Sequence, residues 1–174
     1  MNLYLRLFLL LLGLIGLPRR GLFEESRVSF RVLPTDCDVN FHMNNGRYLS
    51  FMDLGRAHMV AQIGLLGPIV RNRWMPVLAA AEINFIRQLG PFQKFDLVTR
   101  LVTWDDKYAY MEQRFESDGV LCAHAFVKGL FLAKGRRVNN PELVAATGYT
   151  GAAPAMPEAL RLWVELGSVK KQNV

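Results

Sequence analysis

The order of hydrophobic patterns along the chain restricts its fold more than any other feature. Residues 27–32 alternate polar and apolar side chains, which is typical of a half-buried strand. A helical pattern follows that can begin at Asn44 or Asn45 and end at Gly64. Its length of about 18 residues corresponds to about 27 Å, long enough to lie across a sheet. The apolar positions at helical steps are Tyr48, Leu49, Met52, Met59, Val60 and Ile63.

Four strand-like runs then occupy most of residues 77–132. The runs are 77–86, 95–104, 108–117 and 120–132, and the Asp118-Gly119 pair is typical of a tight turn between the last two. Residues 65–76 are expected to form a loop. The pattern predicts an α+β fold in which a five-stranded antiparallel sheet wraps around one long helix. An open sheet edge favours pairing with a second copy.

The 174 residues fit one domain with appended segments. We expect an apolar N-terminal segment at 1–21, the main domain at 22–135 and a C-terminal extension at 136–174. Prolines break the extension into short helices and loops, and its last helix is expected at 157–167.

The N-terminal segment is apolar or glycine from residue 3 to residue 17, except for Tyr4 and Arg6. This stretch is shorter than the roughly 20 residues that a membrane-spanning helix needs. Three interpretations remain open: a helix at a membrane surface, a helix packed on protein, and a signal peptide with a poor cleavage site. Arg19 and Arg20 suit acidic lipid headgroups. We therefore expect a cytoplasmic protein with peripheral membrane association.

Charge and cysteine content exclude several classes of protein. The net charge is +6, which favours anionic partners, but Lys and Arg never run longer than two residues, so nucleic-acid binding is not indicated. The two cysteines, Cys37 and Cys122, cannot form a multi-bridge framework and lack a metal-type spacing. They are expected to be reduced thiols, and no metal site is predicted.

The stretch "PTDCDVNFHMNN" at 34–45 concentrates polar side chains between the first strand and the long helix. One interpretation is structural, because Thr35, Asp36 and Asn44 are residue types that satisfy local backbone groups and cap helices. A single histidine such as His42 is also commonly a hydrogen-bonded structural residue.

A chemical interpretation rests on the alternation of Asp38, Asn40 and His42. An extended backbone would turn all three side chains to one side, directly before a helix start whose free amides can hold an anion. A carboxylate, an imidazole and an oxyanion site together are suited to hydrolysing an ester or thioester.

At this point the chain resembles a known family. The segments "TDCDVNFHMNNGRYLSFMDLGRA" and "EINFIRQLGPFQKFDLVTRL" are similar to hotdog-fold acyl-CoA thioesterases of the hydroxybenzoyl-CoA thioesterase-like family, which includes members with an apolar N-terminal segment. The shared motif is D-x-N-x-H-x-N-N-x-x-Y. The resemblance implies a hotdog fold and homodimers or homotetramers whose active sites lie at subunit contacts.

The resemblance also implies roles for individual residues. Asp38 matches the family's nucleophile or general base, and Asn40 and His42 match polar residues that accompany such an aspartate in plant acyl-ACP thioesterases. Asn45 matches the position whose backbone amide contributes to the oxyanion site. Arg56 matches a structural basic position, expected to pair with a carboxylate such as Asp53 or Glu82.

The implied substrate is an acyl-CoA or acyl-carrier-protein thioester, with CoA as part of the substrate and no separate cofactor. Residues 64–70 and Phe85 are expected to line an acyl tunnel. For each candidate for binding the CoA phosphates, the interpretation as an ordinary surface charge is favoured over phosphate binding. These candidates are Arg71, Arg73, Arg87, Lys94 and Lys128.

Two other functions remain open. The apolar N-terminus suits a non-catalytic protein of the same fold that binds acyl lipids or a partner at a membrane. An enoyl-CoA hydratase of this fold uses a D-x-N-P-x-H element, which Asp38, Asn40 and His42 approach without its proline.

Overall fold

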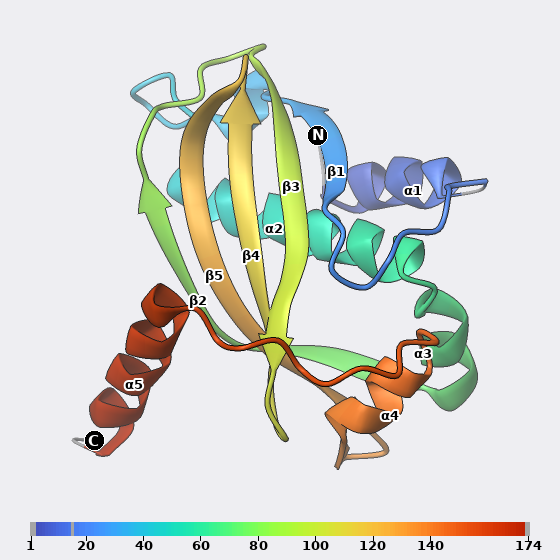
Figure 1. Cartoon of the computed structure of the whole chain (residues 1–174). Coiled ribbons are helices and arrows are strands. Elements are labelled where there is room, and N and C mark those ends of the chain that lie inside the picture. Colours follow the sequence, from blue (N-terminus) through green and yellow to red (C-terminus); the bar gives the residue numbers. More distant parts are fainter. Residues whose placement is uncertain (1–2, 15, 173–174) are drawn as a thin grey trace.

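The computed structural model describes residues 3–14 and 16–172, which form a curved antiparallel sheet with a long helix against one face (Figure 1). The strands run in the order β1-β3-β4-β5-β2, and a short strand, β6, pairs with the end of β5. The predicted α+β arrangement is confirmed, with β6 as an addition. The strands are β1 (Ser26–Arg31), β2 (Trp74–Phe85), β3 (Lys94–Trp104), β4 (Ala109–Ser117), β5 (Val120–Ala133) and β6 (Arg136–Val138).

The long helix α2 (Asn45–Gln62) begins and ends close to the predicted positions. Asn44 is its N-cap, because its side-chain oxygen accepts a hydrogen bond from the Gly46 N–H at 2.9 Å. Midway along the helix, a Cβ atom on Gly55 would lie only 2.6 Å from Leu97 Cδ2 and 2.8 Å from Thr99 Oγ1. Glycine at this position therefore lets the helix lie directly on the sheet.

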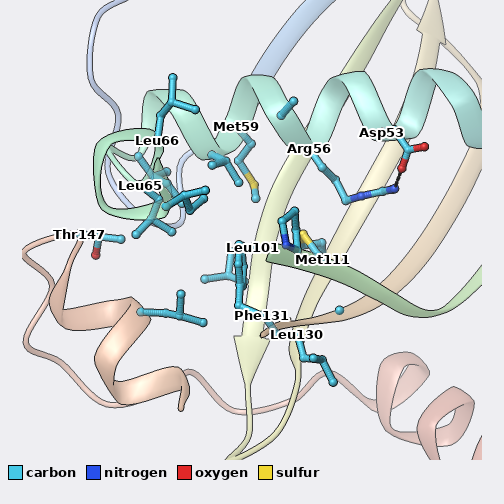
Figure 2. Close-up of a pocket in the computed structure, with 18 of the residues that line it drawn as sticks. Asp53, Arg56, Met59, Leu65, Leu66, Leu101, Met111, Leu130, Phe131 and Thr147 are labelled. Atoms are coloured by element: carbon cyan, nitrogen blue, oxygen red, sulfur yellow. Dashed lines mark hydrogen bonds and ion pairs between the residues drawn. The ribbon is translucent and has the colours of Figure 1, made fainter. Parts of the chain in front are cut away.

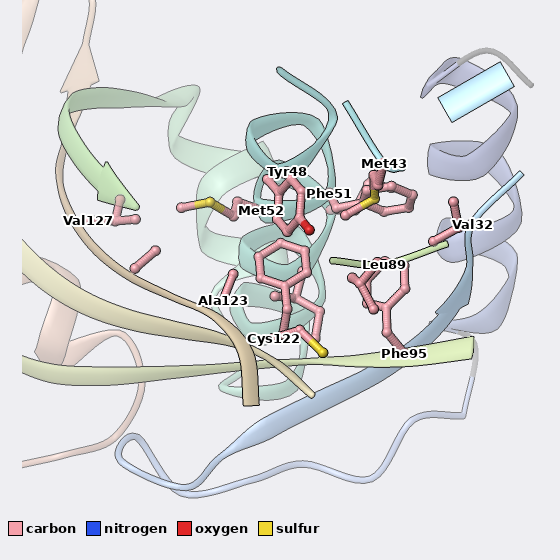
Figure 3. Close-up of a cluster of buried hydrophobic side chains, with 14 of the residues drawn as sticks. Val32, Met43, Tyr48, Phe51, Met52, Leu89, Phe95, Cys122, Ala123 and Val127 are labelled. Carbon is pink, nitrogen blue, oxygen red and sulfur yellow. The ribbon is translucent and has the colours of Figure 1, made fainter. Parts of the chain in front are cut away.

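Two hydrophobic clusters lie between α2 and the sheet, one under each half of the helix. The first is rich in aromatic rings and is drawn in Figure 3, where Tyr48, Phe51 and Phe95 pack closely. The second is mainly aliphatic and lies under the C-terminal half of α2. Its buried members are Leu22, Met59, Ile63, Leu65, Trp74, Leu101, Val138 and Leu143.

The segment 65–76, predicted to be a loop, instead contains helix α3 (Leu66–Asn72) and the start of β2. Leu65 is buried in the second cluster and Ile69 packs against it, so tertiary contacts support a helix too short to be stable alone. Arg73 adopts a left-handed conformation (φ 53°) that ends the helix. Trp74 is buried in the same cluster, which places the start of β2 earlier than predicted.

The N-terminal helix α1 (Leu3–Gly13) packs beside α2 (Figure 1). Leu10 is buried in the first cluster, whereas a different side of the helix exposes apolar side chains. Among the residues that the structure describes, no helix has both the length and the apolar character needed to cross a bilayer. The exposed side chains are Leu5, Phe8, Leu9, Leu11 and Leu12.

The C-terminal extension contains helices α4 (Asn140–Ala145) and α5 (Glu158–Gln172). Leu143 of α4 is buried in the second cluster. Helix α5 runs five residues beyond the predicted end at residue 167 and lies away from α2 (Figure 1). Its Trp163 ring lies beside the Phe126 ring of β5, with centroids 6.2 Å apart.

Candidate active site

The polar stretch between β1 and α2 forms a tight turn. A short 3-10 helix, η1 (Pro34–Asp36), is followed by a β-bridge between Cys37 and Met43. The Asp38 N–H donates to the His42 carbonyl at 2.9 Å, and Phe41 adopts a left-handed conformation (φ 59°). The expected extended backbone is therefore wrong. The chain reverses between Asp38 and His42, and these two residues lie opposite each other.

The three predicted polar residues all belong to this turn. The Asp38 carboxylate accepts a hydrogen bond from the Asn40 N–H at 2.9 Å, so it stabilises the turn and keeps a fixed position. Asp38 and His42 are half-buried, whereas Asn40 is exposed. Two apolar side chains of the same turn, Val39 and Phe41, are 92% and 75% exposed, which is unusual for residues of their type.

The turn is attached to the start of α2. The Asn44 N–H donates to the Asp36 carbonyl at 2.9 Å, and an Arg47 side-chain nitrogen donates to the Thr35 carbonyl at 3.1 Å. Asn45 is the first residue of the helix. Its N–H is one of the amides that a helix cannot pair internally, and it lies at the positive end of the helix dipole. An anionic oxygen next to the turn can be stabilised there.

Asp36 is anchored by a residue that sequence reasoning did not connect to it. It is only 1% exposed, and its Oδ2 accepts hydrogen bonds from Arg6 Nη2 at 2.5 Å and from the Leu33 N–H at 2.9 Å. Arg6 is itself buried and lies over the Phe51 ring at 4.5 Å. The sequence offered one indication of this pair, because Arg6 is the only charged residue in an apolar stretch of 15 residues and a buried charge needs a partner.

Only one of the two carboxylate oxygens of Asp36 is hydrogen-bonded within residues 3–14 and 16–172. Within the described part of the chain, its Oδ1 has no hydrogen-bond partner. Arg47 Nε lies 3.8 Å from this oxygen in an ion pair. Arg6 is therefore the principal partner of this buried carboxylate. The structural interpretation of Asp36 and Asn44 agrees with these contacts.

A cavity of about 470 Å³ lies under the C-terminal half of α2 (Figure 2). Leu65, Leu66 and Ile69 of the predicted tunnel segment line it. Phe85 does not, because it packs edge-on against Tyr48, with ring centroids 4.9 Å apart. Sequence reasoning therefore found part of the lining but missed the contributions of α1 and α4.

Asp53 and Arg56 form an ion pair at this cavity, which confirms the first of the two expected partners of Arg56. Arg56 also donates to Gln113 Oε1 at 2.8 Å. Burial lowers the pKa of the Arg56 guanidinium below its usual value, and the Asp53 carboxylate opposes this effect. Glu82, the second candidate, accepts a hydrogen bond from Asn84 instead.

The candidates for CoA phosphates occupy several places. Arg71 and Arg73 are exposed at the end of α3, and Arg87 and Lys94 are exposed on either side of the β2–β3 connection. Lys128 is only 7% exposed, and its Nζ lies near the Tyr108 and Trp163 rings under α5. Both cysteines are free, as predicted.

The fold is a sheet curved around one long helix, with a polar turn directly before the helix start. Residues 32–164 match the sequence profile of the thioesterase-like superfamily. The chain is 37% identical over 139 residues to protein THEM6 of Danio rerio, covering 72% of this chain and 68% of that protein. It is 32% identical over 147 residues to protein THEM6 of Drosophila melanogaster, covering 82% and 74%.

Solved structures agree on the fold. The crystal structure of a probable thioesterase from Bartonella henselae aligns with a TM-score of 0.62 at 23% identity, covering 67% of this chain and 98% of that one. The chain belongs to the thioesterase-like superfamily, so the family predicted from the motif is confirmed. Its membership supports thioester hydrolysis as the general activity.

Proposed function

We propose that this protein hydrolyses an acyl-CoA or acyl-carrier-protein thioester to a free acid and a thiol, with Asp38 as the general base or nucleophile. The observation that carries the proposal is the turn that holds Asp38 and His42 opposite each other and is bonded to the start of α2. The proposal is supported by a carboxylate and an imidazole in a turn that directly precedes a helix start, because thioester hydrolysis requires a base and donors for the oxyanion.

In the proposed reaction, Asp38 removes a proton from water and the resulting hydroxide attacks the thioester carbonyl carbon. The backbone N–H of Asn45 stabilises the oxyanion, and His42 orients the acyl carbonyl. The C–S bond then breaks and the thiolate receives the proton. Asn40 positions the base, because its N–H holds Asp38 Oδ1 and leaves Oδ2 for the water. If Asp38 attacks directly, water hydrolyses the resulting anhydride.

The CoA moiety would enter as part of the substrate, with no separate cofactor or metal. Four of the predicted phosphate-binding residues are exposed and can reach an anion, namely Arg71, Arg73, Arg87 and Lys94. Lys128 suits this role less well, because its side chain is buried beneath α5.

We propose that the active unit is a homodimer, or a tetramer built from it, paired through β2. The two edges of the sheet differ: β1 carries Arg27 and Arg31, whereas β2 exposes Met75, Leu78 and Phe85. Charged edges resist pairing and apolar edges invite it. The pairing would be antiparallel if the two copies are related by a two-fold axis.

This pairing would also complete the site. Phe85, at one end of β2, contacts Tyr48 near the start of α2, whereas Pro76 and Leu78, near the other end, line the cavity. Within one chain, the catalytic turn and the cavity are therefore separated along α2. Antiparallel β2 strands would bring the turn of one copy near the cavity of the other.

The exposed apolar side of α1 supports a peripheral position at a membrane. We expect Phe8→Ser combined with Leu12→Ser to weaken binding to anionic vesicles by about tenfold or more, since both side chains would enter the interface. Leu162→Ser, which changes a similarly exposed leucine on α5, is the matched control. Equal vesicle binding by the wild type and the double variant would contradict this position.

A panel of acyl-CoAs tests the hydrolysis. We expect thiol release by the wild type, and Asp38→Asn should lower kcat by about 10² or more, because the variant keeps the shape but loses the base. Asp106→Asn, at an exposed aspartate away from the turn, should leave kcat unchanged.

Undiminished turnover by Asp38→Asn would reject the assignment of the base. An absence of thiol release over the whole panel, with acyl binding retained, would favour the non-catalytic alternative. Hydration of an enoyl-CoA without thiol release would favour the hydratase.

A further inference from the structure

The cavity under the second half of α2 is lined almost entirely by carbon. The polar groups at its wall already have partners: Asp53 pairs with Arg56, Asn140 donates to the Asp105 carbonyl at 2.5 Å, and Thr147 donates to the Val144 carbonyl at 2.6 Å. A hydroxylated aromatic acyl group would lose its hydrogen bonds to water here and find few polar groups to replace them. An alkyl chain would lose none.

Its volume of about 470 Å³ lies within the usual range of small-molecule sites, roughly 300–1,000 Å³. Protein interiors are otherwise packed without voids of this size. The first cluster, under the same helix, is close-packed, with Phe51, Met52 and Phe115 fully buried. The space is therefore a local feature of one end of the core, suited to an apolar guest.

Helix α1 forms part of the wall of this cavity. Leu7 and Leu11 of the helix line it and are four residues apart, as expected for one side of a helix, and Leu14, just after the helix, also lines it. Leu12 is half exposed and does not line the cavity. Leu7 is therefore on the cavity side of α1 and Leu12 on its outer side, whereas Leu11 lines the cavity but is also 43% exposed.

The same helix is fastened to the catalytic turn. Arg6 lies one residue before Leu7, and its guanidinium bonds to the buried Asp36, two residues before Asp38. A buried carboxylate without its partner is strongly unfavourable. A shift of α1 in response to the contents of the cavity would therefore act on the turn of the same chain, which in the proposed dimer belongs to the other active site.

We propose that the cavity binds an aliphatic acyl chain, that α1 is the wall that sets the chain length, and that Arg6 is a positioning residue linking this wall to the catalytic turn. The binding of the chain stands independently, whereas the role of Arg6 rests on the proposed hydrolysis.

Binding is tested on the full chain with cis-parinaric acid, a fluorescent fatty acid, displaced by saturated fatty acids of increasing length. Affinity should rise about fourfold per added methylene, because burial contributes about 0.8 kcal/mol per CH2, and then level off when the cavity is full. 4-Hydroxybenzoate should displace the probe about 100-fold less well than a long-chain acid, because its hydroxyl finds no partner.

Leu11→Trp should reduce the volume of the cavity, whereas Leu12→Trp adds the same side chain at a residue that does not line the cavity. We expect Leu11→Trp to move the plateau to shorter chains and to weaken the longest acid about tenfold or more, with Leu12→Trp unchanged. Equal affinity of both variants for all chain lengths, or hydroxybenzoate binding as tightly as a long-chain acid, would overturn the proposal. These measurements need no turnover, so they remain informative if hydrolysis is not observed.

The role of Arg6 is tested by kinetics on short and long acyl-CoAs. Arg6→Met should lower kcat about tenfold or more for both lengths with little change in KM, and Arg6→Lys should restore part of it. If Arg6→Met does not fold, the double variant with Asp36→Asn removes both buried charges and should fold. A wild-type kcat in either folded variant would reject the positioning role.

Discussion

The two halves of α2 are surrounded differently, although they belong to one helix. The first half packs against aromatic rings, including the perpendicular pair Phe51 and Phe95 with centroids 5.0 Å apart. The second half faces aliphatic side chains and the 470 Å³ cavity. Dense packing keeps side chains in fixed positions, whereas unfilled apolar space can bind an apolar ligand. One helix therefore has a polar turn beside a densely packed region at one end and unfilled apolar space at the other.

The largest expected effect is on stability at the packed end. Phe51→Ala should lower the free energy of unfolding by about 3–5 kcal/mol, because it leaves a cavity among buried rings. It also removes the surface under the Arg6 guanidinium. Ile69→Ala, at the cavity wall, should cost about 1 kcal/mol, since the side chain is already beside unfilled space.

Urea unfolding of both variants under the same conditions measures the difference. Similar losses for Phe51→Ala and Ile69→Ala would show that the two ends of the core are packed alike.

The turn of one copy and the cavity of the other can be tested together in mixed dimers. Asp38→Asn and Leu11→Trp should each be poorly active on long-chain acyl-CoA as homodimers. In an equimolar mixture after subunit exchange, about a quarter of wild-type activity should return if each site uses the turn of one copy and the cavity of the other. The reason is that half of the dimers are mixed and each has one intact site.

Activity of the mixture is read as thiol release, and unmixed variants at the same total concentration are the controls. If the mixture stays as inactive as its components while mixed dimers are detected, the turn and the cavity of the same chain work together.

The smallest expected effect is on the outer face of the sheet, which contacts neither half of α2. The hydrogen bond from His124, aided by Arg100, lowers the pKa of Glu112 from 4.5 to about 2 despite partial burial. Since the folded-state pKa is below the unfolded one, Glu112 stabilises the fold fully above pH 4.5. This contribution is lost as the pH falls from 4.5 towards 2.

Glu112→Gln should therefore lower stability by about 1–3 kcal/mol at neutral pH and flatten the pH dependence in this window, with kcat unchanged. Thermal unfolding at several pH values measures it. An unchanged pH profile would indicate that other carboxylates dominate the acid response.

Much of the fold could be predicted because its signals are local. The helical spacing and the capping residue Asn44 located α2, and Asp118-Gly119 located the β4–β5 turn, where both residues have positive φ (51° and 76°). Helix α3 was missed because its stability comes from Leu65 and Ile69 packing on distant residues. Intrinsic propensity does not report such contacts.

The candidate site was predictable in composition but not in geometry. Asp38, Asn40 and His42 were chosen by residue type and spacing, and the structure places them on one turn. Their backbone was mispredicted because a left-handed phenylalanine at Phe41 is uncommon. Arg6 and Asp36 are 30 residues apart in sequence, and an unfilled cavity leaves no pattern in the chain. The Arg6–Asp36 ion pair and the cavity both form only when the chain has folded.

Gly55 lies near the middle of α2, where a Cβ atom would come too close to Leu97 and Thr99 of the sheet. Any side chain there has to displace the helix, its neighbours on the sheet, or both. A methyl group at residue 55 would therefore push the helix away from the sheet and disturb both the polar turn before α2 and the cavity under its second half.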